Sequence, residues 1–245
     1  MKNSSAFLTD GKNTENGNSV HDNKERIRAL EKFIHAGIAI PCPDSVIISP
    51  DCIIGKGTVI LPSTIIRSGC KIGSDCIIGP STVLYKVRVG SETTLNSVQA
   101  HECEIGSNVT AGPFVHVRPG SIISDDVHIG NFVEVKNSVI GKSTHISHLT
   151  YVGDSDVGNG VNFGCGVVTV NFNGREKNRC TIGNDAFIGC NTNLIAPVKI
   201  GERAYTAAGS TITDDVPADA LAIARSRQQN KENWVTVKKP YREKN

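Results

Sequence analysis

The chain has 245 residues, a length that suits one or two domains, and a formal net charge of only +2 at pH 7. This charge gives no strong electrostatic argument for nucleic-acid binding. No apolar run is long enough to cross a membrane, and the polar start lacks the apolar segment of a signal peptide. Aromatic residues are scarce, at 5%, whereas Val and Ile abound, which favours a core of repeated aliphatic side chains over an ordinary globular core.

Two segments precede the repetitive part of the chain. Residues 1–23 are rich in Asn, Ser, Gly, Lys and Asp and have almost nothing to bury, so we expect a disordered tail. Residues 24–43 are expected to form a linker helix and cap, with the helix over 24–36 ending before Gly37. The apolar face of this helix is formed by Ile27, Leu30, Phe33 and Ile34.

An aliphatic residue recurs every six positions from Ile48 to Leu84. The residue two places before each one, from Cys52 to Thr82, is always Cys or Thr. This period is typical of a solenoid, in which short strands meet at tight corners and one large aliphatic side chain per face points inward. It predicts an all-β fold, a parallel β-helix of hexapeptide repeats over residues 44–225. Three hexapeptides make one triangular coil, so equivalent residues of successive coils should stack at about 4.8 Å.

The six-residue period is interrupted further along the chain. It slips through residues 85–104, where polar residues indicate a looser coil or a small excursion. It is regular again from Ile105 to Thr169, apart from two one-residue deletions. The next inward residue, Ile182, comes thirteen rather than six positions later, so a loop of seven extra residues should leave the solenoid within Asn171–Arg179.

The end of the chain departs from the repeat after residue 212. Leu221–Ile223 is expected to form a last strand, and residues 226–245 an irregular, basic C-terminal tail. The apolar Trp234 and Val235 of this tail should pack back on the solenoid or on a neighbouring subunit.

The eight cysteines would suggest disulfides in a secreted protein. Five of them, however, lie two positions before an inward aliphatic residue, where a small buried side chain is expected: Cys52, Cys70, Cys76, Cys103 and Cys180. No C-x-x-C motif occurs, so zinc-ribbon and thioredoxin-like sites lack their signature. Reduced thiols and the missing export signal predict a cytoplasmic location.

Residues that flank an inward position on a strand point outward, and these predict where chemistry occurs. Arg118 should lie one coil from Lys136, while His116, Glu134 and Tyr151 form a second outward column. Two stacked cations repel each other unless an anion lies between them, and a substrate phosphate would serve. The alternative is that both cationic side chains reach into solvent.

His148 lies two residues after an inward Ile, near a corner where its ring should be accessible. Histidine takes up a proton near neutral pH, so His148 is a candidate general base, with Glu134 as the partner that would fix its tautomer. A purely structural role is the alternative. A metal site must also be weighed, because histidines cluster in this region: His116, His128, His145 and His148. The shifting phase of the repeat should scatter them over different faces, so we expect no metal site.

Cys165, Cys190 and Ala208 each lie two residues after an inward residue. Small side chains in such a column leave backbone N–H and C=O groups accessible along a groove, in which an extended pantetheine arm could lie. Ordinary corner packing of small residues is the alternative. A nucleophilic role for either cysteine lacks an obvious base.

Several motifs place rare polar residues at intervals that resemble those of one family. They are Gly112–Gly120 (GPFVHVRPG), Gly130–Lys136 (GNFVEVK), His148–Gly153 (HLTYVG), Asn162–Asn171 (NFGCGVVTVN), Lys177, Ala207–Gly209 and Leu221–Arg225 (LAIAR). Between about residues 24 and 234 the chain resembles the acetyltransferase half of the bacterial bifunctional N-acetylglucosamine-1-phosphate uridyltransferase/glucosamine-1-phosphate acetyltransferase. The resemblance implies a homotrimer of left-handed parallel β-helices.

The resemblance also implies a role for each matching residue. His148 would be the general base that deprotonates the sugar amine, and Glu134 would orient it. The sugar phosphate would be held by Arg118, Lys136, Tyr151, Asn162 and Lys177, with Asn171 reaching the reaction centre from a neighbouring chain. The backbone N–H of Cys165 would stabilise the oxyanion, and the co-substrate acetyl-CoA would lie along Cys190, Ala208 and Arg225. No metal is implied.

The implied reaction moves an acetyl group from acetyl-CoA to the amine of glucosamine 1-phosphate, giving N-acetylglucosamine 1-phosphate for UDP-N-acetylglucosamine and cell-wall synthesis. Phe172-Asn173-Gly174 departs from the Tyr-Asp-Gly usual in the family, which leaves open another amino sugar phosphate or a sugar nucleotide as the acceptor. Cys165 and Cys190 stand where many members have Ala and Ser.

The uridyltransferase domain of the family, with its Gly-rich nucleotide loop, is not found in this sequence. The chain is therefore not expected to make the UDP-sugar by itself, and a separate uridyltransferase becomes an expected partner. The non-enzymatic alternative is an inactive trimeric scaffold for that second enzyme.

Overall fold

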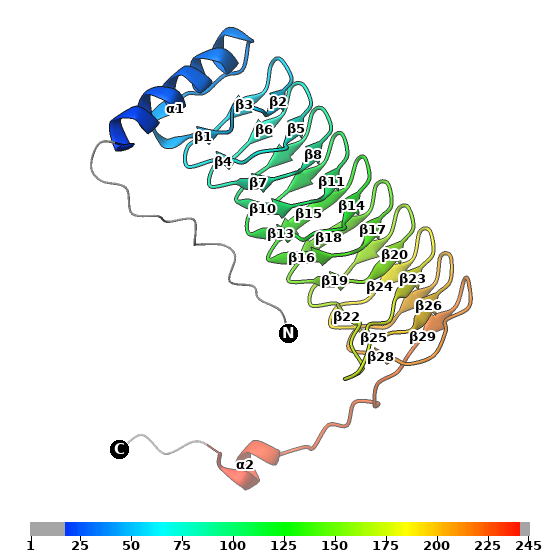
Figure 1. The fold of residues 1–245 in the computed structure, drawn as a ribbon. Helices are drawn as coiled ribbons and strands as arrows, with labels where there is room; N and C mark the ends of the chain where they lie inside the picture. The colour runs from blue at the N-terminus through cyan, green and yellow to red at the C-terminus, as the bar shows by residue number, and fades with distance from the viewer. Residues whose placement is uncertain (1–17, 241–245) are drawn as a thin grey trace, which may run out of the picture.

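The computed structural model describes residues 18–240, and its strands wind into one long parallel β-helix (Figure 1). The chain begins with helix α1 (Asn18–His35) and a single 3-10 turn (Pro43–Ser45), and it carries a short helix α2 (Trp234–Lys238) near its end. Between them, successive strands belong in turn to three sheets, which we number first, second and third.

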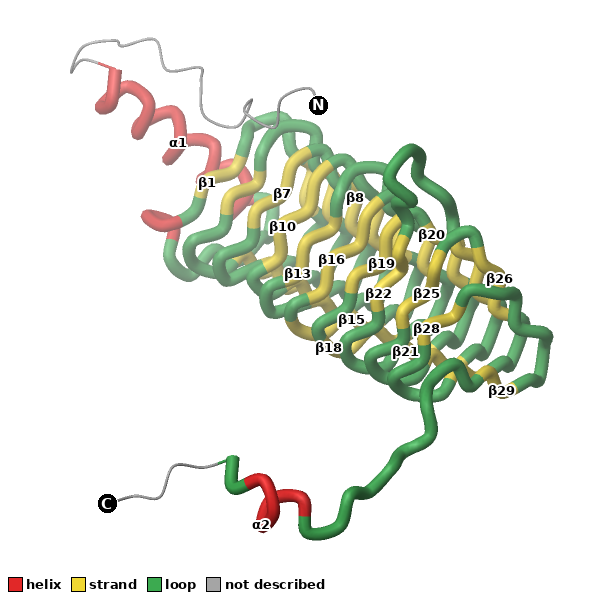
Figure 2. The backbone as a smooth tube through the Cα atoms, turned by 90° about the horizontal axis from the view of Figure 1, so that it is seen from below, coloured by secondary structure: helices red, strands yellow, loops and turns green. Residues whose placement is uncertain are grey.

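The three sheets are the faces of a triangular prism (Figure 2). The ten strands of the first are β1 (Ile47–Ile48), β4 (Ile65–Ile66), β7 (Val83–Tyr85), β10 (Val98–His101), β13 (Val115–Val117), β16 (Val133–Lys136), β19 (Tyr151–Gly153), β22 (Val168–Val170), β25 (Asn193–Ile195) and β28 (Thr211–Ile212). The nine strands of the second are β2 (Ile53–Ile54), β5 (Lys71–Ile72), β8 (Arg88–Val89), β11 (Glu104–Ile105), β14 (Ile122–Ile123), β17 (Val139–Ile140), β20 (Ser155–Val157), β23 (Cys180–Ile182) and β26 (Val198–Ile200). The ten strands of the third are β3 (Val59–Ile60), β6 (Ile77–Ile78), β9 (Thr94–Leu95), β12 (Thr110–Ala111), β15 (His128–Asn131), β18 (His145–His148), β21 (Asn162–Phe163), β24 (Phe187–Ile188), β27 (Tyr205–Thr206) and β29 (Leu221–Ala222).

The predicted stacking is confirmed, because Ile48 pairs with Ile66 and Ile60 with Ile78 in parallel register. The inward aliphatic side chains fill the prism, and Ile60, Ile66 and Ile78 have no exposed surface. Each such side chain contributes roughly 1.5–3 kcal/mol when it leaves water. The five corner cysteines are buried and all eight are unpaired, as the pattern predicted. Corner hydroxyls link the coils: Thr58 Oγ1 donates to the Gly73 carbonyl at 2.9 Å and accepts from the Cys76 N–H at 3.1 Å.

The prediction of a looser coil over residues 85–104 is wrong. Strands β8, β9 and β10 extend the three sheets without a break. Val89, Leu95 and Ala100 are buried at the inward positions. The spacing to Val89 and to Ala100 is five residues rather than six, since a corner can lose one residue while the strands keep their pairing.

The extra loop within Asn171–Arg179 is confirmed. It separates β22 from β23, and an isolated antiparallel bridge joins Phe172 to Lys177 across its base. The expected last strand is also present as β29, one residue shorter than predicted.

Helix α1 caps the first coil but differs from the prediction in two respects. It begins at Asn18, so residues 18–23 are helical, while residues 1–17 lie outside the described residues. Leu30 and Phe33 are buried against the solenoid, whereas Ile27 and Ile34 are 42% and 45% exposed. A helix turns about 100° per residue, so Ile27 and Ile34 lie together on one side of Leu30, and Phe33 lies on the other side. The buried stripe that includes Leu30 and Phe33 therefore leaves the two isoleucines at its edge.

The C-terminal segment does not pack back on its own solenoid. It leads away from the last coil to α2, where Trp234 and Val235 are 45% and 52% exposed (Figures 1 and 2). Between residues 18 and 240, no helix combines the length and the apolar character needed to cross a bilayer.

Candidate functional site

The expected site residues lie along the two long edges of the first sheet. The edge that the first sheet shares with the second, here called the 1–2 corner, carries Arg118, Lys136, Asn171 and Lys177. The edge that it shares with the third sheet, the 3–1 corner, carries His148, Cys165, Cys190 and Ala208. Glu134 and Tyr151 are register partners that face outward from the first sheet between the two corners.

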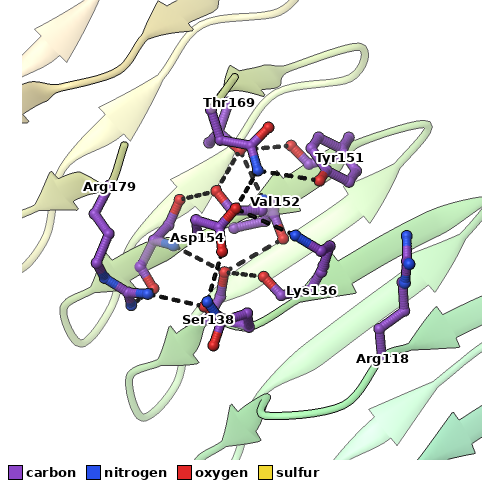
Figure 3. A network of polar contacts seen from close by, with 12 residues as sticks. Arg118, Lys136, Ser138, Tyr151, Val152, Asp154, Thr169 and Arg179 are labelled. Carbon is purple, nitrogen blue, oxygen red and sulfur yellow. Dashed lines mark hydrogen bonds and ion pairs between the residues drawn. The ribbon is translucent and has the colours of Figure 1, made fainter. Parts of the chain in front are cut away.

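Arg118 and Lys136 stack at the 1–2 corner as predicted, because Val117 pairs with Val135 and Arg118 N–H donates to the Val135 carbonyl at 2.8 Å. Each cation has a carboxylate partner within its own chain. Arg118 Nη1 donates to Glu134 Oε1 at 2.9 Å. Lys136 Nζ donates to Asp154 Oδ2 at 3.3 Å (Figure 3).

Asp154 is the centre of a buried polar network at this corner (Figure 3). Only 3% of it is exposed, and its carboxylate accepts from Asn137 Nδ2 at 2.6 Å, from Asn171 Nδ2 and from Lys136. Burial works to raise the pKa of Asp154, but the two amides and the ammonium hold it below its ordinary value. Burial likewise works to lower the pKa of Lys136, yet the Asp154 carboxylate keeps that pKa raised.

The loop within Asn171–Arg179 brings a third cation to this corner. The pKa of Lys177 is lowered by the Lys136 ammonium beside it, and Arg118 adds to the repulsion. Arg179 fastens the far end of the loop by donating to Asp156, to the Asn137 carbonyl and to the Ser155 carbonyl. The corner therefore brings together three cations and two carboxylates, and the excess positive charge suits an anion.

Asn173, one of the departures from the family pattern, shapes this loop. Its Oδ1 accepts from the backbone N–H groups of Arg175 and Glu176, both at 2.9 Å. This is an Asx-type turn, so the residue has a structural function in the loop. The neighbouring Phe172 is 55% exposed.

His148 lies at the 3–1 corner, at the end of β18. Its Nδ1 is 2.9 Å from Oδ1 of Asn131, its register partner in the preceding coil. The amide oxygen can only accept, so Nδ1 carries the hydrogen, and in the neutral ring the lone pair is on Nε2. Within one chain Glu134 does not contact His148, because it faces outward from the neighbouring sheet and binds Arg118.

Backbone amides line the 3–1 corner beyond His148. The Cys165 carbonyl accepts from Asn191 N–H at 2.7 Å, and the Cys190 carbonyl accepts from Gly209 N–H at 2.8 Å. Within residues 18–240, the N–H groups of Cys165, Cys190 and Ala208 donate to no acceptor. Cys165 is half-buried, whereas Cys190 and Ala208 are exposed. The side chain of Arg225 passes beside Gly209 at the end of this row of amides.

Comparison with known proteins agrees with the repeat fold. The bacterial transferase hexapeptide model (six repeats) matches residues 45–86, 102–137 and 179–214. The bifunctional protein GlmU of Halalkalibacterium halodurans is 52% identical over 211 residues, which cover 86% of this chain and 46% of that protein. GlmU of Caldicellulosiruptor saccharolyticus is 51% identical over 220 residues, covering 90% and 48%.

The chain is a hexapeptide-repeat protein that matches the C-terminal half of GlmU. It spans about half the length of these curated relatives. A solved UDP-N-acetylglucosamine acyltransferase from Arabidopsis aligns with a TM-score of 0.52 at 21% identity, covering 74% of this chain and 70% of that one. That likeness concerns the fold, and with the repeats it confirms the predicted left-handed parallel β-helix.

The four histidines scatter only in part, since His116 lies on the first sheet and the other three on the third. His128 and His145 are register partners on the third sheet with ring centroids 5.8 Å apart, and His148 ends the same strand as His145. Burial lowers the pKa of His128, and the charges of His145 and His148 lower it further. No group of three or more potential metal ligands occurs in the described part of the chain. Asn162, expected to bind the sugar, follows His145 in this outward row.

Two residues of this candidate site were not found from the sequence, namely Asn131 and Asp154. Each lies two positions after an inward aliphatic residue, Ile129 and Val152 respectively. The same spacing singled out His148, so applying it to every coil would have revealed both. Asp154 would then have been noticed as a carboxylate in the coil that follows Lys136.

One copy of the chain does not close a site around both groups. Within residues 18–240, no hydrogen bond or ion pair joins His148 to Arg118, Lys136 or Lys177. A groove of 780 Å³ on the outer face of the second sheet, between Val139 and Ala218, contains none of the expected site residues. The two groups therefore present complementary halves at the two edges of one face.

Proposed function

We propose that the protein is an acetyltransferase that moves an acetyl group from acetyl-CoA to the amine of glucosamine 1-phosphate, giving N-acetylglucosamine 1-phosphate for UDP-N-acetylglucosamine synthesis. The observation that carries the proposal is the group of cations at the 1–2 corner, Arg118, Lys136 and Lys177, in a chain that is 52% identical to a GlmU over 211 residues.

The three cations would bind the phosphate of the sugar. Arg118 offers a planar pair of donors and the two lysines offer point charges. A phosphate dianion would relieve the mutual repulsion of Lys136 and Lys177, which the lowered pKa of Lys177 reflects. Tyr151, Asn162 and Asn171 would contact the sugar.

His148 would act as the general base. An amine is mostly protonated near neutral pH and attacks only after it loses a proton, which the unprotonated Nε2 of His148 can accept. His148 passes this first proton to solvent. The amine nitrogen then bonds to the thioester carbonyl carbon and loses its second proton to Nε2 as the C–S bond breaks, and His148 passes that proton to the leaving thiolate. General base catalysis of this kind supplies roughly 10²–10⁴-fold.

Acetyl-CoA would lie along the 3–1 corner. The unused amides of Cys190 and Ala208 suit the carbonyl groups of a pantetheine arm, and Arg225 suits a phosphate of CoA. The Cys165 N–H would stabilise the oxyanion of the tetrahedral intermediate, a contribution of about 3 kcal/mol. Both acyl-CoA and sugar phosphates are cytoplasmic metabolites, in keeping with eight unpaired cysteines.

A complete site would need a second copy of the chain. His148 and Asn162 of one copy would face Arg118, Lys136 and Asn171 of a neighbour, and repeating this contact around a three-fold axis gives the expected homotrimer. A separate uridyltransferase would consume the product.

Replacing His148 with Ala tests the proposal. We expect acetyl-CoA consumption with glucosamine 1-phosphate to fall at least about 10²-fold, while light scattering still finds a trimer. An unchanged rate would exclude His148 as the base. An intact trimer of the unmodified protein that consumes no acetyl-CoA with any amino sugar would instead support the scaffold alternative.

Phe172 is the reason to consider acceptors other than glucosamine 1-phosphate. Its exposed ring stands in the loop that brings Lys177 to the cations of the 1–2 corner, where the family usually has a tyrosine. Another amino sugar phosphate or a sugar nucleotide would suit a more apolar rim. A panel of acceptors that includes glucosamine 1-phosphate, other amino sugar phosphates and UDP-glucosamine distinguishes them by kcat/KM.

A further inference from the structure

Only 8% of Asn171 is exposed, and the two ends of its side-chain amide have different surroundings. Its Nδ2 donates to Asp154 Oδ2 and lies 3.4 Å from the Tyr151 hydroxyl. An amide nitrogen has two hydrogens, and these two oxygens take both of them. Its Oδ1 accepts no hydrogen bond from any residue between 18 and 240.

The Asp154 carboxylate allows only this orientation of the amide. Turning the Asn171 amide over would place its carbonyl oxygen against the carboxylate and leave a buried charge without that donor, which is strongly unfavourable. Asn137 and Lys136 hold the carboxylate in place from other directions. The acceptor end of Asn171 is therefore fixed, and it is the end without a partner.

We propose that Asp154 is a positioning residue that holds the Asn171 amide with Oδ1 directed at the amine of the acceptor sugar. This inference rests on the proposed acetyltransferase function and deepens it. Oδ1 would accept an N–H of the attacking amine, so that the nitrogen lone pair points at the thioester carbon once His148 has removed a proton. Because the bond needs an N–H donor that remains after deprotonation, the arrangement selects an amino group over a hydroxyl.

Replacing Asp154 with Asn tests this inference. The substituted side chain has the same shape but can face either end of the Asn171 amide, so the fixed orientation is lost. We expect kcat with glucosamine 1-phosphate to fall about 10²-fold with little rise in KM, because the phosphate-binding cations remain. Asp126→Asn is the matched control, since Asp126 accepts from Asn108 Nδ2 at 2.7 Å and pairs with Lys142 at 3.2 Å far from this corner.

A double-mutant cycle separates this role from general stabilisation. Asn171→Ala alone and Asn171→Ala with Asp154→Asn should have the same kcat if Asp154 acts through Asn171. Independent, multiplying losses would overturn the inference, as would an Asp154→Asn enzyme as fast as Asp126→Asn. If the unmodified protein has no acetyltransferase activity, the proposed function is overturned, and the role of Asp154 with it. If the unmodified protein is active and Asp154→Asn leaves its kcat unchanged, only the role of Asp154 is overturned.

Asn171→Asp keeps the inference testable if Asp154→Asn does not fold. A carboxyl group at position 171 must carry a proton in order to donate to Asp154. We therefore expect activity to decline with rising pH in a range where the unmodified enzyme shows no such decline. A pH profile parallel to that of the unmodified enzyme would overturn the inference.

Discussion

His148 is oriented by a residue of the preceding coil. Asn131 Oδ1 lies 2.9 Å from Nδ1, and this contact decides which ring nitrogen is available to take a proton. The two residues stack because each lies two positions after an inward aliphatic side chain in successive coils of the third sheet. The tautomer of the proposed base is therefore a consequence of the repeat.

Replacing Asn131 with Ala should lower kcat about 10- to 100-fold and leave the KM for both substrates nearly unchanged. The ring loses the acceptor that keeps hydrogen on Nδ1, so part of the population has the wrong tautomer. Steady-state kinetics checks this. Thr110→Ala is the control, because Thr110 Oγ1 makes an equivalent 2.7 Å contact with Nδ1 of His128 on the same sheet. Equal losses in the two variants would contradict a specific role for Asn131.

For single residues, the sequence predicted where side chains lie better than which groups they contact. It placed Arg118 one coil from Lys136 and His148 near a corner, because both follow from counting residues. It assigned Glu134 to His148, whereas within one chain Glu134 binds Arg118 and Asn131 binds the imidazole. Which of several nearby polar groups pairs with a side chain depends on the directions of side chains at a corner, and the spacing alone does not contain them.

At the scale of the strands and the corners that join them, the hydrogen bonds of the corner hydroxyls affect the stability of each coil. Thr64 and Thr82 occupy the same corner position in two neighbouring coils, and Val98 occupies this position in the following coil. Thr82 Oγ1 donates to the Leu95 carbonyl at 3.1 Å, but Thr64 Oγ1 is buried and has no partner within the described residues. An unpaired buried hydroxyl is destabilising.

Replacing Thr64 with Val should therefore stabilise the protein by about 1 kcal/mol, because the methyl group needs no hydrogen bond and valine already fits this corner. Replacing Thr82 with Val should instead destabilise it by about 1–3 kcal/mol, since the substitution removes an acceptor from the Val98 N–H. Denaturant unfolding of both variants checks the two signs. A loss of stability in Thr64→Val would show that its hydroxyl has a partner after all.

The hydrogen bonds of Asp51, which connect the first two coils, predict how the stability of the protein changes at low pH. The Asp51 carboxylate accepts from Ser49 Oγ at 2.5 Å, from Ser68 Oγ at 2.9 Å and from Gly69 N–H at 2.8 Å. These hydrogen bonds, led by that of Ser49, lower the pKa of Asp51 to about 2. A depressed pKa contributes stability above the unfolded-state pKa of about 3.9, and this is lost as the pH falls toward 2.

Asp51→Asn should therefore be less stable than the unmodified protein at pH 7, and the difference should shrink between pH 4 and pH 2. Thermal unfolding of both proteins over this range measures it. A difference that stays constant down to pH 2 would contradict the contribution of the ionised carboxylate.

The elements were the most predictable level of this molecule. A period of six with small corner residues specifies parallel strands, their register and the emerging loop, and each is present. The exceptions are places where the period shortens or ends. Corners tolerate the loss of a residue, so residues 85–104 form regular coils although their spacing in the sequence is irregular. Helix α1 lies outside the repeat, and the period of six therefore does not indicate which of its apolar residues face the solenoid.

For the whole molecule, the separation of the site into two edges matters most. His148 and the row of free amides lie at the 3–1 corner, whereas the cations and the Asp154 network lie at the 1–2 corner. The first sheet stands between the corners, and its stiffness prevents them from meeting within one chain. The proposed reaction requires both, so each site must combine corners of two copies.

Mixing two inactive variants tests this arrangement. His148→Ala and Arg118→Ala should each lose at least about 10²-fold in activity as homotrimers. Co-expressed in equal amounts, they should regain about one quarter of the unmodified activity, because in a randomly assembled cyclic trimer a quarter of the sites draw an intact His148 from one copy and an intact Arg118 from its neighbour. Differently tagged chains purified in tandem establish that mixed trimers have formed. Mixed trimers that remain as inactive as the separate variants would place both residues of each site in a single chain and refute the shared site.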